Sequence, residues 1–294
     1  MVDRAISYLV RRGTFYEGPR WHDGRWWVSD FYRHAVLAIS PDGVEEVMLE
    51  VEAQPSGMGW MPDGSLLVAA MKSRQLLRRA PDGTVSVHAD LKTHCPGHLN
   101  DMIVDGAGRA YVGNFGYDVA GGEKRRPTSL VRVDPDGTVS AAADDLSFPN
   151  GTIITPDGRT LVVAETMASR LTAFTVQDDG SLTDRRVWAQ LGTFREPGTA
   201  GAIGPDGCCL DAEGCIWMAD AFGRRCVRVA DGGEIAEEIQ GPGGLGIYAC
   251  MLGGADGRTL LLCSAPNFGE RERINATDAV LLTTEVDVPH AGLP

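Results

Sequence analysis

The feature that most constrains the fold of this chain is a hairpin pattern that occurs six times along it. Each copy contains a strand, a turn rich in Gly and Asp, and a second strand with alternating or continuous apolar residues. The six copies span residues 21–30, 60–70, 103–114, 154–165, 210–220 and 253–264. Most are followed by another hairpin, at 39–47, 79–87, 133–141, 176–184 and 229–237. Each repeat therefore contains four predicted strands.

The period of this pattern selects one architecture. Glycines in successive turns, from Gly24 to Gly257, are about 40–56 residues apart, a spacing typical of propeller blades. A pair of β-sandwiches would not explain so regular a period. We therefore predict an all-β fold, a six-bladed β-propeller with four-stranded blades around a central channel, as a single domain over residues 1–294. The segment 5–15 precedes the first repeat, and we expect it to add an outer strand to the last blade and close the ring.

Composition limits the partners and the compartment. The net charge of −13 argues against nucleic acid or an anionic membrane as a partner. The chain lacks a run of about 18 apolar residues, and its N-terminal segment is too charged for a signal peptide. Its seven cysteines include no CxxC pair, which favours buried free thiols in a reducing compartment. We expect a cytoplasmic protein, a monomer or small homo-oligomer, that binds a small molecule.

A polar or acidic residue stands about eight positions before the turn in five of the six repeats. These residues are Glu17, Ser56, Asn100, Asn150 and Asp206, and Ala249 holds the sixth place. In a propeller the first strand of each blade lines the channel, so the five side chains would converge on its axis. Oxygen donors without His or Cys favour Ca²⁺, Mg²⁺ or Mn²⁺ over structural Zn²⁺. We expect one divalent cation, with Ca²⁺ as the first candidate and Mg²⁺, Mn²⁺ or Zn²⁺ as alternatives. The competing interpretation is that these residues only make local turn contacts.

Further polar residues are predicted near the same rim. The second strands end at Asp30, Met71, Asn114, Glu165, Asp220 and Ser264, which would support the first ring or cap the loops that follow. Those loops contain Arg33, His34, Lys72, Arg74, Lys124, Arg125, Arg126, Arg170, Arg224, Arg225, Arg271 and Arg273. They would form a basic mouth that steers an anionic substrate, or they are solvated side chains without such a role.

Two long loops and one histidine complete the candidate site. The loops at 115–129 and 192–204 are longer than the others and would serve as lids or pocket walls. His98 lies two residues before Asn100, so along a strand both would face the channel. His98 would then contact a substrate or take part in proton transfer. A packing or solvent role is the alternative for this side chain.

Four local motifs resemble one known family over nearly the whole chain. They are Glu17-Gly18-Pro19, His98-Leu99-Asn100-Asp101, Phe148-Pro149-Asn150-Gly151, and Pro205-Asp206-Gly207 with the Asp211-Ala212-Glu213-Gly214 that follows. Together they resemble the superfamily of senescence marker protein (regucalcin), gluconolactonase and luciferin-regenerating enzyme.

The resemblance implies a six-bladed propeller with one divalent metal in its channel. The metal ligands of the family match Glu17, Asn150 and Asp206, and its water- or substrate-contacting Asn matches Asn100. Asp206 is also the position of the usual candidate for general base. The sugar lactonases of the family carry Arg where this chain has His98, and the 115–129 loop also differs. Both departures argue against a sugar lactone as the substrate.

The leading functional hypothesis is a metal-dependent lactonase or esterase-like hydrolase. The cation would polarise a lactone or ester carbonyl, and Asp206 would accept a proton from the attacking water or attack directly. Asn100 and His98 would orient the substrate. One alternative uses the same metal for other carbonyl or phosphotriester chemistry. Another is a calcium- or ligand-binding propeller without catalytic activity.

Overall fold

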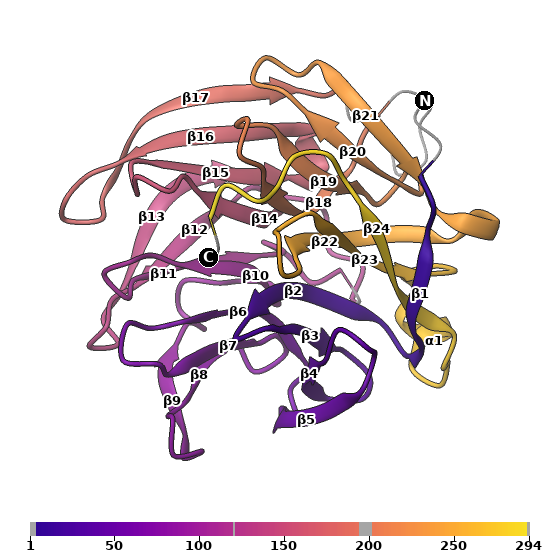
Figure 1. Cartoon of the computed structure of the whole chain (residues 1–294). Helices are drawn as coiled ribbons and strands as arrows, with labels where there is room; N and C mark the ends of the chain where they lie inside the picture. The colour runs from indigo at the N-terminus through magenta and orange to yellow at the C-terminus, as the bar shows by residue number, and fades with distance from the viewer. Residues whose placement is uncertain (1–3, 120, 194–201, 293–294) are drawn as a thin grey trace.

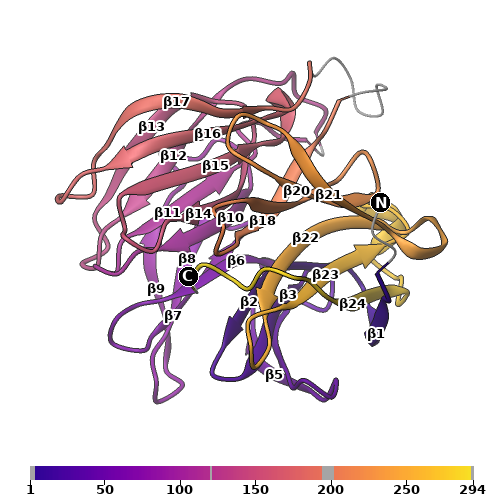
Figure 2. The same cartoon turned by 45° about the horizontal axis from the view of Figure 1, so that its top comes forward.

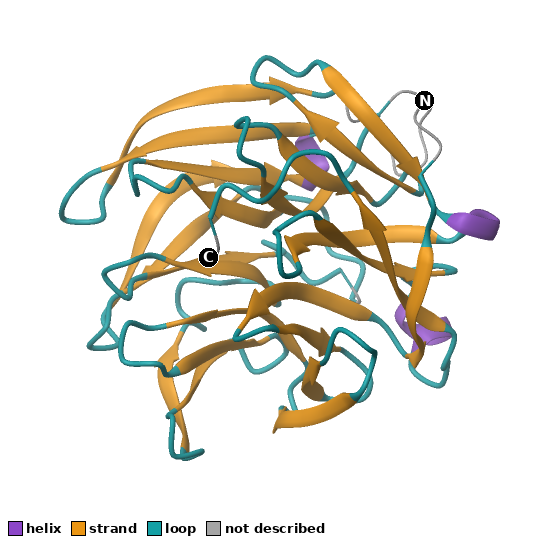
Figure 3. Ribbon diagram, in the orientation of Figure 1, coloured by secondary structure: helices purple, strands orange, loops and turns teal. Residues whose placement is uncertain are grey.

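Six antiparallel sheets of four strands each make up this protein. The computed structural model describes residues 4–119, 121–193 and 202–292. Its sheets follow one another in chain order around a common axis (Figure 1). The predicted six-bladed, four-stranded β-propeller is thus confirmed. Within the described residues, helix is confined to α1 (Glu270–Arg273) and the 3₁₀ turns η1 (Thr166–Ala168) and η2 (Pro242–Gly244) (Figure 3). None of these is long and apolar enough to span a membrane.

The first five blades are continuous in sequence, and each contains four consecutive strands. Blade 1 contains β2 (Tyr16–His22), β3 (Arg25–Asp30), β4 (Ala35–Ile39) and β5 (Glu45–Glu50), and blade 2 contains β6 (Pro55–Trp60), β7 (Leu66–Ala70), β8 (Gln75–Arg79) and β9 (Val85–Asp90). Blade 3 contains β10 (Leu99–Val104), β11 (Ala110–Asn114), β12 (Thr128–Val133) and β13 (Val139–Leu146). Blade 4 contains β14 (Pro149–Ile154), β15 (Thr160–Glu165), β16 (Arg170–Val176) and β17 (Leu182–Gln190), and blade 5 contains β18 (Pro205–Leu210), β19 (Ile216–Asp220), β20 (Arg225–Val229) and β21 (Ile235–Gln240).

The sixth blade joins the two ends of the chain. It contains β22 (Gly246–Gly253), β23 (Thr259–Ala265) and β24 (Ala279–Glu285), with β1 (Ser7–Gly13) as its outer strand (Figure 2). β1 runs antiparallel to β24, with Ser7 opposite Thr283. The expected closure of the ring by segment 5–15 is therefore confirmed. It covers the edge of β24 and ties the first blade to the last.

The recurring turns explain why the repeat shows so clearly in the sequence. The glycine in the turn after each first strand has a positive φ, between 71° and 83° across the six blades. Residues with a Cβ rarely adopt this conformation, so a chain built of such hairpins repeats glycine at the same phase.

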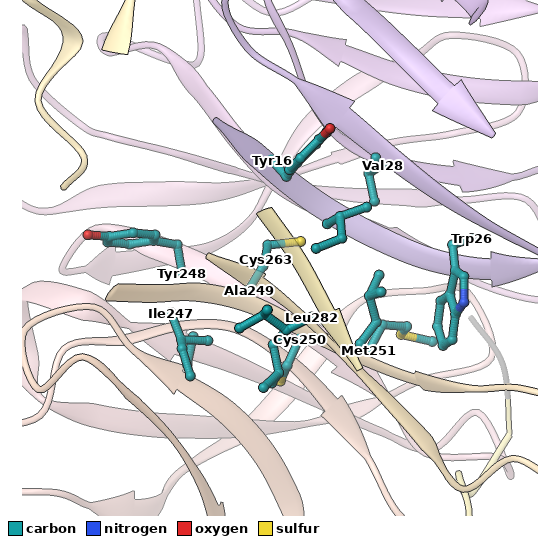
Figure 4. Packing of buried hydrophobic residues seen from close by; sticks show 14 of the residues in the cluster. Tyr16, Trp26, Val28, Ile247, Tyr248, Ala249, Cys250, Met251, Cys263 and Leu282 are labelled. Carbon is teal, nitrogen blue, oxygen red and sulfur yellow. The ribbon is translucent and has the colours of Figure 1, made fainter. Parts of the chain in front are cut away.

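The apolar core lies in the gaps between neighbouring blades. Leu67 and Ala69 of β7 pack toward blade 3, whereas Leu66 and Val68 pack toward blade 1. Alternate residues of one strand thus enter different clusters, because successive side chains point to opposite faces of a sheet. The largest cluster joins blades 5, 6 and 1, and Figure 4 shows part of it around Cys250 and Leu282. A strand buried on both faces has to be apolar at almost every position.

The cysteines belong to this core. All seven are free thiols and six of them are buried, while Cys215 is partly exposed. Burial raises the pKa of Cys208, Cys209, Cys250 and Cys263 well above the usual value, so these thiols stay protonated. The prediction of buried free thiols is confirmed for the six buried cysteines.

Glycines allow the first strands to approach each other closely at the axis. A Cβ on Gly57 would collide with the backbone of Asp101 and Met102, and one on Gly151 would collide with the backbone of Asp206 and Cys208. In each case the obstacle is main chain of the next blade, which cannot rotate away as a side chain can.

We expect Gly151→Ala to destabilise the fold by about 1–3 kcal/mol, because the added methyl group forces two first strands apart. Urea unfolding measures this change. Gly106→Ala is the matched control, since nothing lies within 4 Å of its added Cβ. The control should leave stability unchanged or raise it slightly. Equal stability of the two variants would show that the close approach of strands at the axis is unimportant.

Candidate functional site

Five of the predicted ring residues occupy one structural position. Each is the second residue of the first strand of its blade: Glu17 in β2, Ser56 in β6, Asn100 in β10, Asn150 in β14 and Asp206 in β18. The pairing of every first strand with its neighbour shows an extra residue at this point, which is a β-bulge. A bulge redirects a side chain out of the regular alternation. The six-fold pattern of polar residues therefore coincides with a six-fold backbone irregularity.

The prediction for the sixth blade was wrong by one residue. In blade 5 Pro205 pairs with Asp220, and in blade 6 Ile247 pairs with Ser264. Tyr248, the residue after Ile247, is therefore the equivalent of Asp206. Ala249 packs instead in the core. The turn of blade 6 is reached after a different number of residues, so counting back from its glycine gave the wrong position.

Two carboxylates meet at the axis. Asp206 is buried, and Glu17 is partly exposed at the floor of the cavity described below. Burial raises the pKa of Glu17 well above its usual value, and the charges of Asp206 and Asp101 raise it further. Burial together with Asp101 raises the pKa of Asp206 to about 8. Both shifts show that the protein by itself stabilises the two negative charges poorly.

Among the described residues, one buried cation lies near these carboxylates, and it is already paired. Arg20 donates from Nη2 to Asp101 Oδ1 at 3.0 Å and to the backbone oxygen of Met102 at 2.5 Å. If Glu17, Asp101 and Asp206 were all ionised, this guanidinium would leave two of their negative charges uncompensated. A divalent cation carries the charge that would balance them.

The two amides add neutral oxygens to this set. Asn100 donates from Nδ2 to the backbone oxygen of Pro149 at 3.2 Å, and Asn150 donates from Nδ2 to Thr166 Oγ1 at 3.2 Å. With each nitrogen held, the amide oxygen is the atom available to a cation. In the described part of the chain, no group of three or more side chains drawn from His, Cys, Asp and Glu is arranged to hold a metal ion. The donor set is thus carboxylate and amide oxygen, which fits a hard cation such as Ca²⁺ or Mg²⁺.

His98 lies beside Asn100 on the wall of the same cavity. Its backbone oxygen accepts from Phe115 N at 2.9 Å, and its ring lies 5.8 Å from the Phe115 ring. Burial and the charge of Lys72 lower the pKa of His98, so the imidazole is neutral at physiological pH. A neutral imidazole can both donate and accept a hydrogen bond.

These residues line one cavity of about 850 Å³. Glu17, Asn100, Asn150 and Asp206 contribute to it together with His98. Most of the remaining wall is apolar: Phe15, Phe31, Met71, Phe115, Val119, Phe148, Met167, Ala221, Phe222, Phe268 and Ile274. The cavity combines a charged floor with largely hydrophobic sides, an arrangement typical of a small-molecule site.

The loops contribute unequally to this cavity. The predicted 115–129 loop supplies Phe115 and Val119. Most of the predicted 192–204 loop, residues 194–201, lies outside the described residues. Sequence reasoning used the segment 266–278 between β23 and β24 only for its cations Arg271 and Arg273, and it missed that this segment, which contains α1, also supplies Phe268 and Ile274 to the cavity. Its length, well beyond a tight turn, was the available signal.

At least six of the twelve side chains in the predicted basic mouth have an acidic partner. Arg33 pairs with Glu45, Arg126 with Glu123, Arg170 with Glu165, Arg225 with Asp220 and Glu238, Arg273 with Asp278, and Lys72 with Glu270. Of the cations in that prediction, Lys72 and Arg271 line the cavity. Most of the others therefore have structural partners.

The second ring caps loops, which is the alternative that the sequence left open. Asp30 accepts from the backbone N–H of Thr14 and Phe15, Glu165 from that of Ser147, and Asp220 from that of Gly204. Each donor precedes the first strand of the same blade, so these carboxylates fix the chain as it enters the axis. In blade 2 the equivalent residue is Ala70, which pairs with Pro55, and not the predicted Met71.

Comparison with known proteins matches this chain to one family. The model described as the SMP-30/Gluconolactonase/LRE-like region matches residues 15–266. The pentonolactonase XacC of Haloferax volcanii is 31% identical over 240 residues, which cover 80% of this chain and 75% of the relative. Several further lactonase relatives are covered to 64–65% of their own length.

Solved structures agree with this match. A gluconolactonase from Xanthomonas campestris shares 25% identity with a TM-score of 0.73, over 98% of this chain and 90% of that one. A calcium-binding protein, regucalcin from Agrobacterium tumefaciens, shares 22% identity with a TM-score of 0.80, over 99% of this chain and 97% of that one. The second similarity concerns the fold alone.

Proposed function

This chain belongs to the SMP-30/gluconolactonase/LRE-like family, and from that premise we propose that it is a lactone hydrolase dependent on one divalent cation. The observation that carries the proposal is the pair of uncompensated carboxylates, Glu17 and Asp206, at the floor of a substrate-sized cavity. A lactonase relative that is 31% identical supports the type of reaction.

Glu17, Asn150 and Asp206 would hold the cation, and Ca²⁺ is the first candidate because the donors are oxygens. When bound, the cation supplies a Lewis acid that polarises the lactone carbonyl. Its charge would oppose the effect of burial on Asp206, so that this carboxylate would be ionised at neutral pH. An ionised Asp206 is the form that can accept a proton.

In the proposed reaction, a water oxygen bonds to the carbonyl carbon while Asp206 accepts a proton from that water. The bond between the carbonyl carbon and the ring oxygen then breaks, and the ring oxygen takes the proton back from Asp206. The product is an open-chain hydroxy acid. Asn100 and the neutral His98, which lie on the cavity wall, would orient the lactone. Direct attack by Asp206 is the alternative first step.

The test is hydrolysis of a panel of five- and six-membered lactones, followed as acid release, with and without a chelator. We expect turnover that a chelator abolishes and that Ca²⁺, Mg²⁺ or Mn²⁺ restores. Full turnover in metal-free protein would contradict the proposed role of the cation. Binding of the cation without turnover of any lactone or ester would favour a non-catalytic binding protein.

A further inference from the structure

We infer that the lactone accepted by this site carries an apolar substituent, of the size of a phenyl ring or a pentyl chain, in place of the hydroxyl groups of a sugar. The inference rests on the proposed function and concerns the cavity above the carboxylates. It follows from how the aromatic side chains are distributed around that cavity.

One wall of the cavity is an aromatic stack from blades 3 and 4. The rings of Phe115 and Phe148 are stacked, with centroids 4.5 Å apart and planes 15° apart. The His98 ring lies next to Phe115, and the Tyr117 ring lies 6.2 Å from Phe148. This wall, from here on the stacked wall, presents a broad apolar face beside Asn100 and Asn150.

A second group of aromatic rings comes from blades 1 and 6. The Phe15 ring lies 5.3 Å from Phe31 and 5.0 Å from Tyr248, and the Tyr248 ring lies 5.9 Å from Phe268. In Figure 4 the Tyr248 ring extends away from the packed side chains of Ala249 and Cys250. Tyr248 holds the ring position that is Asp206 in blade 5, so this blade contributes an aromatic group where its neighbour contributes a ligand.

The mouth of the cavity exposes large apolar side chains. Phe268 is 55% exposed, Val119 50% and Ile274 49%, and all three line the cavity. They come from two loops that are far apart in the sequence. Apolar side chains gathered at the entrance of a cleft mark a surface that is covered when a ligand binds.

The wall also carries polar side chains, and two of them are engaged with protein partners. Lys72 Nζ donates to Glu270 Oε1 at 2.6 Å, and Thr166 donates from Oγ1 to the backbone oxygen of Pro205 at 2.7 Å. A sugar lactone carries hydroxyl groups around its ring. Each hydroxyl group that is buried without a hydrogen-bond partner lowers the affinity of the lactone about tenfold or more. An alkyl or aryl substituent has no such requirement and gains from contact with the two aromatic groups.

The test compares three lactones that share a six-membered ring: δ-valerolactone, its 6-pentyl derivative and glucono-δ-lactone. We expect kcat/KM for the pentyl lactone to exceed that for glucono-δ-lactone by at least about 100-fold, since a buried methylene contributes about tenfold or more. A preference for glucono-δ-lactone would overturn the inference.

Binding separates this inference from the proposed function. The lactam analogues of the pentyl and glucono compounds resist hydrolysis, and calorimetry measures their affinities. Tighter binding of the pentyl lactam without turnover of any lactone would support the inference of an apolar cavity and contradict the proposed hydrolase function. Turnover with tighter binding of the gluconolactam would do the opposite.

A variant tests whether the aromatic rings contact the substituent. Phe268→Ala removes an exposed ring and should leave the fold intact. It should lower kcat/KM for the pentyl lactone about tenfold while changing that for unsubstituted δ-valerolactone little. Tyr8→Ala, on the outer strand β1, is the control and should change neither value. Equal losses on both lactones would place the rings outside the substituent site and overturn the inference.

Discussion

Asp206→Asn is expected to lower kcat by about 10²–10⁴-fold, because the amide cannot accept a proton from the attacking water. The amide keeps an oxygen that can coordinate, so the cation should still bind, though more weakly for the loss of one charge. The measurement is kcat for a good lactone substrate at a Ca²⁺ concentration that saturates the variant, with Ca²⁺ affinity determined separately by calorimetry.

Two outcomes would contradict this role of Asp206. Retention of full kcat would exclude it as base or nucleophile. Complete restoration of kcat at a high Ca²⁺ concentration would show that Asp206 acts only as a metal ligand. Asp23→Asn is the matched control, because the Asp23 side chain is 82% exposed and lies in the first hairpin turn, away from the cavity. It should leave kcat and Ca²⁺ affinity unchanged.

Calcium is expected to stabilise the folded protein, and to do so more strongly at pH 8 than at pH 6. Without a cation, the raised pKa values of Glu17 and Asp206 mean that folded protein holds protons that unfolded protein releases above about pH 4. The stability contributed by this pair is therefore present at low pH and lost as pH rises through about 8. Ca²⁺ must displace those protons, and each displaced proton weakens binding about tenfold for every pH unit below the pKa of its carboxyl group.

Thermal unfolding with and without Ca²⁺ at the two pH values measures this coupling. At a free concentration of 100 times Kd, the gain is about 2.7 kcal/mol. Glu17→Gln keeps an oxygen but removes a charge. In the absence of metal it should therefore be more stable than the unsubstituted protein at pH 8, and Ca²⁺ should stabilise it less. If Ca²⁺, Mg²⁺, Mn²⁺ and Zn²⁺ all leave the melting temperature unchanged at pH 8, the axis holds no divalent cation.

The six blades and the closing strand were predictable because the information for them is local. A hairpin requires a residue with positive φ in its turn, and glycines such as Gly64 and Gly158 supply it at a regular phase. Strands buried on both faces are apolar at almost every position, as in β7 and at residues 161–164 of β15. Both signals can be counted along the chain without knowledge of what packs against what.

Predictions made by counting residues along the chain were wrong where the backbone departs from regular strand pairing. Placing the sixth ring residue at Ala249 assumed the same number of residues between ring position and turn as in the other blades, and the strand end placed at Met71 was also one residue too late. The β-bulge near the axis and the length of each hairpin set that number separately in each blade. The error of one residue in blade 6 placed Ala249, a core residue, at the position in the cavity that Tyr248 occupies.

The sequence by itself determined the architecture and the chemical type of the central ring, since turn glycines, strand pattern and polar residues recur at one phase. Only the tertiary structure decided which groups surround that ring. The stacked wall joins Phe115 and Phe148 from two blades, and the pairing of Lys72 with Glu270 joins blade 2 to a segment of blade 6. Such contacts depend on the distances in space between segments that are far apart in the chain. The spacing of residues along the sequence does not predict these distances. The pairing also gives Lys72 an acidic partner beside the exposed apolar side chains of Val119, Phe268 and Ile274.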